Sequence, residues 1–125
     1  MKKNGFTLVE IMITVAIMAV LVAISASIYS GVQKSNRDQA RVRDLQTIKQ
    51  ALEMYRSDKG VYPTDAENEL TLNEKYLTTW PADPVANQSY IYQPIPSGFI
   101  ICAKKEGNMA DFPPCGAGNI GLQSD

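Results

Sequence analysis

The sequence contains no histidine and only two cysteines among its 125 residues. Histidine is the most common metal ligand and general base in proteins, and two cysteines are too few for a Cys-only zinc site. The chain also contains no glycine-rich phosphate-binding loop and no nucleophile placed beside a base. We therefore predict that the protein is not an enzyme, that it has no catalytic or metal-binding residues, and that it neither needs a cofactor nor binds nucleotides directly.

A large net charge of either sign is also missing. The 12 basic and 13 acidic residues leave a formal charge of −1, so nothing in this balance suggests nucleic-acid binding. The length leaves room for one small domain. Apolar residues are concentrated in the first quarter of the chain, where the segment from Phe6 to Ile28 contains a single charged residue, Glu10.

This apolar segment is long enough to cross a membrane. As a helix its 23 residues would reach roughly 35 Å, compared with about 30 Å for the hydrocarbon core of a bilayer. Lys2 and Lys3 precede it, and the positive-inside rule then places the N-terminus in the cytoplasm. We expect a single-pass protein of the inner, or cytoplasmic, membrane whose remaining residues are extracytoplasmic.

Three other interpretations explain part of the pattern: a secretory signal cleaved near Ser27, a plain membrane anchor, and a buried core helix. The signal-peptide interpretation accounts for the two lysines, the apolar run and the small residues at 25–27. It does not explain Glu10, because a carboxylate in hydrocarbon costs on the order of a few kcal/mol unless it is paired or neutralised. The position of Glu10 therefore calls for a partner.

The basic leader KKNG (residues 2–5) followed by FTLVE (residues 6–10) and a long apolar helix resembles the N-terminus of type IV pilins and type II secretion pseudopilins. The resemblance implies that a prepilin peptidase cuts after Gly5 and methylates Phe6, which becomes the first residue. It also implies that Glu10 faces the N-terminal amine of a neighbouring subunit and sets the register during assembly. Many members of the family have glycine at the position of Ala19 and proline at that of Ser27, so we expect a more continuous helix here.

The sequence predicts that the helix continues from Tyr29 to about Asp58. Apolar residues recur there at spacings of three and four and define one amphipathic face, which we expect to pack on a small core: Val42, Leu45, Ile48, Leu52 and Tyr55. Charged residues such as Arg41 lie between them, outside this apolar face. Lys59 and Gly60, with Pro63 shortly beyond, predict the helix end. ALEMY (51–55), Gly60 and YPT (62–64) extend the resemblance, towards G-type pseudopilins.

The remaining residues predict a small globular head. We expect a loop with a short helix between Glu67 and Leu72, and we expect Trp80 to pack the head onto the long helix. Residues 90–92 and 99–103 are rich in aromatic and β-branched types and flank a turn at 94–98, which predicts an antiparallel hairpin. A third strand would complete a small sheet, but the tail from Glu106 carries weak strand signals and its structure stays open.

Cys102 and Cys115 lie in the part of the chain predicted to be extracytoplasmic, where a disulfide is the natural interpretation. Such a bond would stabilise the head by about 3 kcal/mol, and two reduced, buried cysteines are the alternative. The resemblance to G-type pseudopilins also implies a calcium site in a C-terminal loop. Glu106, Asp111 and Asp125 are too scattered to match it, and the cysteine pair occupies the region instead. No calcium site is therefore predicted, and this departure favours a pilus-type subunit.

We thus predict an α+β fold with a leader (1–5), a transmembrane and filament-core helix (6–28), its amphipathic continuation (29–58) and a head (59–125). The resemblance implies a pilin or pseudopilin that polymerises into a pilus or periplasmic filament. The implied partners are further copies of the chain, the peptidase, an assembly ATPase, a platform membrane protein and the membrane. A type II secretion pseudopilin, a DNA-uptake minor pilin and a tip subunit stay open, as does, outside the filament class, a singly anchored binding module that would not need Glu10.

Overall fold

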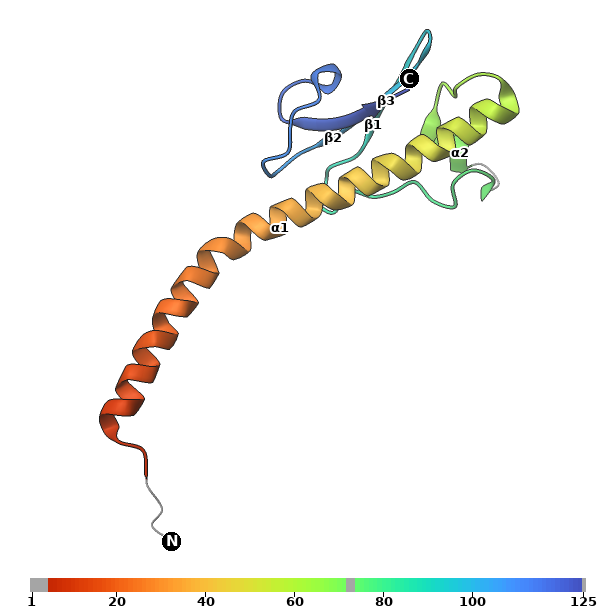
Figure 1. Ribbon diagram of the computed structural model, residues 1–125. Helices are drawn as coiled ribbons and strands as arrows, with labels where there is room; N and C mark the ends of the chain where they lie inside the picture. Colours follow the sequence, from red (N-terminus) through yellow and green to blue (C-terminus); the bar gives the residue numbers. More distant parts are fainter. Residues whose placement is uncertain (1–4, 72–73, 125) are drawn as a thin grey trace. The chain divides into compact units, whose positions relative to one another are not determined.

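The computed structural model describes residues 5–71 and 74–124 (Figure 1). Its elements in chain order are α1 (Leu8–Lys59), α2 (Ala66–Thr71), β1 (Ile91–Ile95), β2 (Gly98–Lys104), the 3-10 turn η2 (Pro113–Cys115) and β3 (Asn119–Gln123). This is the predicted α+β fold. Lys2 and Lys3 of the leader and Leu72 of the expected short helix lie outside the described residues. The chain divides into two compact units, residues 1–33 and 34–125, which we describe separately.

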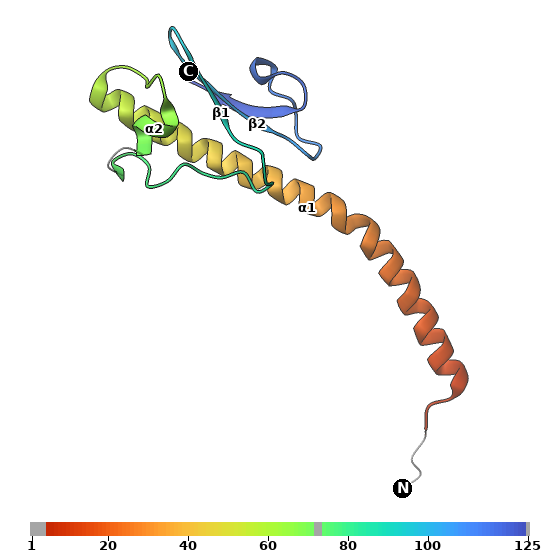
Figure 2. The same ribbon diagram turned by 180° about the vertical axis from the view of Figure 1, so that it is seen from behind.

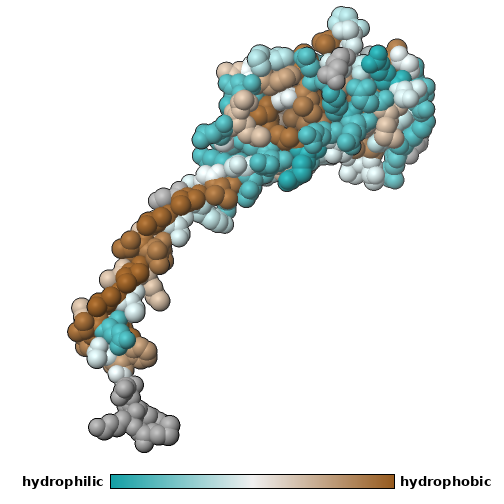
Figure 3. Space-filling view, in the orientation of Figure 1, coloured by the Kyte–Doolittle hydropathy of each residue, from teal (hydrophilic) through white to brown (hydrophobic). Residues whose placement is uncertain are grey.

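The first unit is helical and has no core of its own. Every described side chain from Leu8 to Gln33 is exposed, and Figure 3 shows an apolar surface along this part of the helix. By length and composition the segment is able to span a membrane. A continuous exposed apolar surface of this extent requires lipid or other helices to cover it.

In the second unit, α1 turns the predicted apolar face towards a core. Leu45, Ile48 and Leu52 are fully buried, and Val42 and Tyr55 pack against them from partly buried positions. The amphipathic pattern predicted from the spacing is therefore confirmed.

The helix ends one residue beyond the predicted position, at Lys59. Gly60 follows with a φ of 78°, in the left-handed region, and its N–H donates to the carbonyl of Arg56 at 2.7 Å. Glycine adopts this conformation without steric cost, so it is the usual residue at this place after a helix. The signal at Lys59 and Gly60 thus marks the actual end of α1.

The three strands form an antiparallel sheet in the order β1-β2-β3, which lies along the head part of α1 in both views (Figures 1 and 2). The predicted hairpin is confirmed, but its turn is shorter than expected. Ile95 pairs with Gly98, so only Pro96 and Ser97 connect the strands. Phe99, Ile101 and Ala103 of β2 are buried in the core.

The third strand, whose existence the sequence left open, is β3. The pattern of strand-forming residues in this segment is weak partly because Gly121 interrupts it. A Cβ atom at this position would lie 2.5 Å from the sulfur of Cys115 and 2.8 Å from the ring of Phe112. The close approach of the C-terminal loop therefore requires glycine in the middle of the strand, at the expense of strand propensity.

The loop between α1 and the sheet contains the predicted short helix. α2 buries Ala66 and Leu70 in the core, and the N–H of Leu77 donates to the carbonyl of Leu70 at 3.1 Å. Trp80 packs against the same core from a partly buried position, which agrees with the structural role predicted for it.

Candidate functional site

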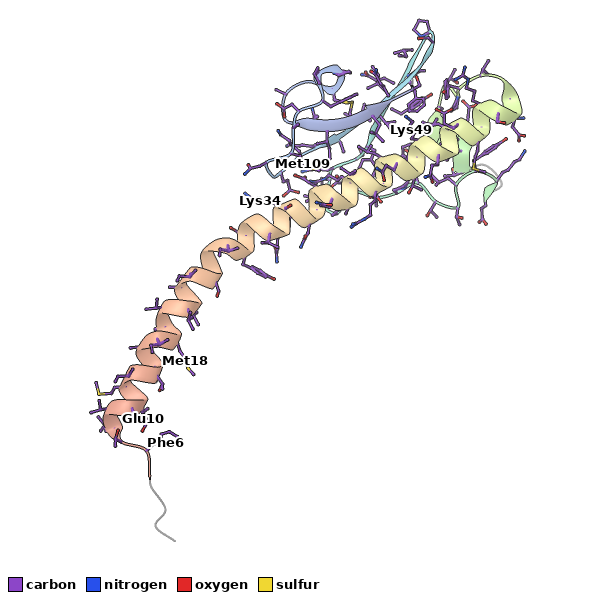
Figure 4. The ribbon with its side chains drawn as sticks, viewed as in Figure 1. Phe6, Glu10, Met18, Lys34, Lys49 and Met109 are labelled. Carbon is purple, nitrogen blue, oxygen red and sulfur yellow. A yellow bond between two sulfur atoms is a disulfide. The ribbon has the colours of Figure 1, made fainter. Side chains whose placement is uncertain are left out.

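The residues to which the resemblance assigns processing and assembly, Gly5, Phe6 and Glu10, lie just before α1 and in its first turn. Figure 4 shows Phe6 and Glu10 at this end of the helix. The Thr7 hydroxyl oxygen accepts a hydrogen bond from the N–H of Glu10 at 3.2 Å, so Thr7 caps the helix and Glu10 occupies the acidic position of a T-x-x-E capping box. A carboxylate in the first turn also interacts favourably with the positive end of the helix dipole.

Glu10 is the single charged residue between Leu8 and Gln33. Its side chain is exposed, and no described residue donates a side-chain hydrogen bond or an ion pair to its carboxylate. The Thr7 cap therefore uses the backbone N–H of Glu10 and leaves its carboxylate available to another molecule. Gly5 and Phe6 are also exposed and precede the first helical residue.

The head contains a second notable group, a buried ion-pair cluster around Arg41. The Arg41 guanidinium donates to both carboxylate oxygens of Asp83, at 2.7 and 2.8 Å. It also donates to Asp38 and to Glu106, at 2.8 Å each, and to the side-chain oxygen of Gln88 at 3.3 Å. The side chains of Arg41 and Asp38 have no exposed surface, and that of Asp83 is 1% exposed.

Two further sets of contacts attach the segment after β2 to the helix. Asp38 accepts hydrogen bonds from the backbone N–H groups of Glu106 and Gly107, at 3.0 and 2.6 Å. Arg37 donates to both carboxylate oxygens of Glu106, at 3.1 and 2.6 Å. Within the described residues, every buried side-chain nitrogen or oxygen has a hydrogen-bond partner. The cluster therefore joins α1, the loop at Asp83 and the segment after β2 without an uncompensated buried polar atom.

The expectation that Arg41 lies outside the buried face of α1 is wrong. Its burial is possible because three carboxylates and an amide compensate for the loss of water around the guanidinium. Asp83 and Glu106 are 42 and 65 residues away in the sequence, so no local pattern could indicate them. The one local signal is the Asp38 and Arg41 pair at a spacing of three.

The arginines keep the cluster's acids ionised. Hydrogen bonds from Arg37, and then from Arg41, lower the pKa of Glu106 to about 2. Burial on its own raises the pKa of Asp83, but hydrogen bonds from Arg41 and from the N–H of Val85 outweigh it, and the pKa is lowered. Both acids therefore bind protons more weakly in the folded head than in the unfolded chain.

This difference in pKa between the folded and unfolded states predicts that acid destabilises the head. The contribution of Glu106 is fully present above its ordinary pKa of 4.5 and is lost as the pH falls towards its folded value of about 2. We expect the free energy of unfolding, followed by Trp80 fluorescence in denaturant, to decline over this interval. Glu106→Gln should lower stability at pH 7 and make the decline shallower, whereas Glu67→Gln, at an exposed acid, should reproduce the wild-type profile. A Glu106→Gln profile parallel to that of the wild type would contradict this assignment.

Cys102 and Cys115 form a disulfide with their Cα atoms 5.7 Å apart, so the predicted bond is present. The bond joins β2 to η2, and it holds the loop between them against the sheet. Asp111 in this loop pairs with Lys105 and accepts a hydrogen bond from the N–H of Gly118 at 3.2 Å. Glu106 thus belongs to the cluster around Arg41, whereas Asp111 pairs with Lys105 in the disulfide loop.

Comparisons with known proteins agree with this anatomy. The family model "Prokaryotic N-terminal methylation motif" matches residues 1–26, and "Type II secretion system (T2SS), protein G" matches residues 27–101. Type II secretion system core protein G of Escherichia coli K12 is 29% identical over 124 residues, 86% of each chain. The core protein G of Vibrio cholerae is 30% identical over 112 residues, 79% of this chain and 77% of that protein. Fimbrial protein EcpC of Eikenella corrodens is 35% identical over 80 residues, 62% of this chain and 52% of that protein. No solved structure matches the chain.

An N-terminal methylation motif, an exposed apolar helix and a small disulfide-bonded α+β head define a pilin-like filament subunit. Within this class, the chain belongs to the type II secretion system protein G family, whose model covers most of the head. The family consists of structural pseudopilins. The resemblance predicted from residues 2–10 is therefore confirmed, and the family model favours the pseudopilin over the pilus-type subunit to which the missing calcium pattern pointed.

Proposed function

We propose that the protein is a non-enzymatic subunit of a type II secretion pseudopilus. The observation that carries the proposal is the part of α1 from Leu8 to Gln33, whose described side chains are all exposed and mostly apolar, and which is attached to a head with its own core. Before assembly this segment spans the inner membrane, with the head in the periplasm. After assembly it packs against the same segments of other subunits, because only lipid or apolar helices can cover such a surface.

Processing by a prepilin peptidase precedes assembly. The peptidase removes residues 1–5 by cutting after Gly5, and methylates the new N-terminus at Phe6. The methylation-motif match over residues 1–26 supports this step. Gly5 and Phe6 also lie in an exposed, non-helical segment ahead of α1, where a peptidase can reach the backbone.

Glu10 then pairs with the N-terminal amine of a neighbouring subunit. If the helix extends to Phe6 in the filament, Glu10 lies about 6 Å along the axis from it, so an incoming subunit displaced along the filament presents its amine to a carboxylate already in the bundle. The two charges neutralise each other where neither is solvated by water. This contact joins different parts of the two copies and displaces each copy along the filament axis, so it propagates as a fibre and does not close into a ring.

Each segment of the chain has its own proposed role. Residues 1–5 are the leader, 6–28 form the membrane and filament-core helix, 29–58 continue this helix into the head, and 59–125 complete the head. The sequence contains no phosphate-binding loop, so the energy for extraction from the membrane comes from a separate assembly ATPase acting through a platform membrane protein.

The N-terminus and intact mass of the protein, purified from membranes of cells that carry their own peptidase, test this proposal. We expect the chain to begin at N-methylated Phe6. A Gly5→Leu variant should retain Met1 and form no filaments. A wild-type chain that begins near Ser27 would indicate an ordinary signal peptide, and one that keeps Met1 would indicate a simple anchor; either result contradicts the proposal.

A type IV pilus subunit is the second candidate, favoured by the similarity to the fimbrial protein EcpC. Deletion of the gene separates the two functions. A pseudopilus subunit is needed for export of secreted proteins, whereas a pilus subunit is needed for surface fibres visible by electron microscopy.

A further inference from the structure

One face of α1 in the head has no partner within the described chain. Its side chains recur at spacings of three and four on the side away from the core, and all are exposed: Gln39, Arg43, Gln46, Gln50 and Met54. Arg43 carries the single charge in this row. Interface centres are typically poor in charged residues but enriched in arginine and methionine, and arginine is frequent among residues that dominate binding energy.

Water solvates the cation of Arg43 while this face is exposed, and a contact that covers the face would have to supply a carboxylate in place of that water. Most carboxylates of the described head are already engaged. Each of the following accepts a hydrogen bond or forms an ion pair within the head: Asp38, Asp44, Glu53, Asp58, Asp65, Glu69, Asp83, Glu106 and Asp111. Among residues 34–71 and 74–124, this leaves Glu67 and Glu74 exposed and without such a partner.

Glu67 has the better-defined position of the two. It lies in α2, which is anchored in the core through Ala66 and Leu70, whereas Glu74 lies in a loop. α2 is held beside the far end of α1, because the Tyr55 hydroxyl donates to Glu69 at 2.5 Å. The rise from Arg43 to Tyr55 along α1 is about 18 Å. Arg43 and Glu67 are thus well separated along the axis of one head, and a second copy displaced along this axis would bring them together.

We infer that the exposed face of α1 is the contact between heads in the filament, and that Arg43 of one subunit pairs there with Glu67 of the next. The inference rests on the proposed filament function and specifies which surfaces meet. The two patches differ from each other, so the contact adds subunits in one direction. A single exposed ion pair contributes little, but this pair is repeated at every subunit, and reversing one charge replaces attraction by repulsion.

Charge reversal in the full-length protein tests the pairing. Arg43→Glu and Glu67→Arg are expressed separately and together in cells that contain the assembly machinery, and filaments are quantified by sedimentation and electron microscopy. We expect each single reversal to lower the filament yield by about tenfold, and the double reversal to restore it to within about threefold of wild type. Lys104→Glu and Glu74→Arg, reversals at exposed residues outside the proposed contact, should assemble normally.

The outcomes distinguish this inference from the proposed function. If the wild type is processed and forms filaments but both single reversals also assemble normally, the head contact is wrong and the proposed function stands. Defective single variants that the double reversal does not restore overturn the pairing of Arg43 with Glu67. A wild type that forms no filaments overturns the proposed function and this contact with it. Thermal unfolding of each variant in detergent shows that the heads remain folded.

Discussion

Glu10→Gln subunits will enter the membrane and lose their leader normally, but they will assemble as poorly as Glu10→Ala subunits. Glutamine is the other residue that suits the third position of a capping box, and the hydrogen bond from the backbone N–H of residue 10 to Thr7 does not depend on the side chain, so this substitution keeps the helix start and removes the charge. The N-terminal amine of the neighbouring subunit then enters an apolar bundle without a counter-ion. A loss of about 3 kcal/mol per contact corresponds to roughly a hundredfold in the association constant.

Filament yield, membrane insertion and leader removal are measured in parallel for each variant. Thr14→Val is the matched control, because Thr14 lies in the same apolar segment and its hydroxyl donates only to the backbone carbonyl of Ile11, at 2.8 Å. It should form filaments normally. Assembly of Glu10→Gln at the wild-type level, together with a defect in Glu10→Ala, would mean that helix capping rather than charge pairing explains the need for Glu10.

The elements that sequence patterns predict well are those built from neighbouring residues. The apolar run, the row from Val42 to Tyr55 and the Gly60 stop each reflect a periodicity or a backbone conformation that one segment specifies by itself. The hairpin is also local, since a two-residue turn joins its strands. The residues proposed for processing and assembly, Gly5, Phe6 and Glu10, also lie within one short segment, which is the segment that the methylation-motif model matches.

The missed features depend on contacts between distant segments. β3 contains Gly121, which makes room for the disulfide loop but lowers the strand propensity of the segment. The sequence of β3 alone therefore gives a weak signal for a strand that pairs with β2 along its whole length. Arg41 looks like an ordinary charged helix residue until Asp83 and Glu106 are placed beside it. A buried charge is compatible with folding only when its partners are present, and single-sequence periodicity contains no information about partners so far along the chain.

Arg41→Met will destabilise the head by about 3 to 5 kcal/mol, a large share of the 5 to 15 kcal/mol typical of a folded domain. Methionine fills part of the same volume but leaves the buried carboxylates of Asp38 and Asp83 without a counter-charge. Removing one member of a buried pair is far more costly than the net value of the intact pair, because the remaining charge cannot regain its water. Denaturant unfolding of the full-length protein in detergent, followed by Trp80 fluorescence, measures the change.

Arg37→Met provides the matched comparison, since Arg37 binds Glu106 from a position where 30% of its side chain is exposed. Water compensates for the loss there, and we expect less than about 1 kcal/mol. Arg41→Lys should fall between the two, because lysine keeps the charge but cannot donate to both oxygens of Asp83. If Arg41→Met proved no more harmful than Arg37→Met, the cluster would not be the feature that holds the Asp83 loop and the segment after β2 to α1. A head loosened in this way would still enter the membrane and lose its leader, so its effect would be confined to the stability of subunits and of the filament they build.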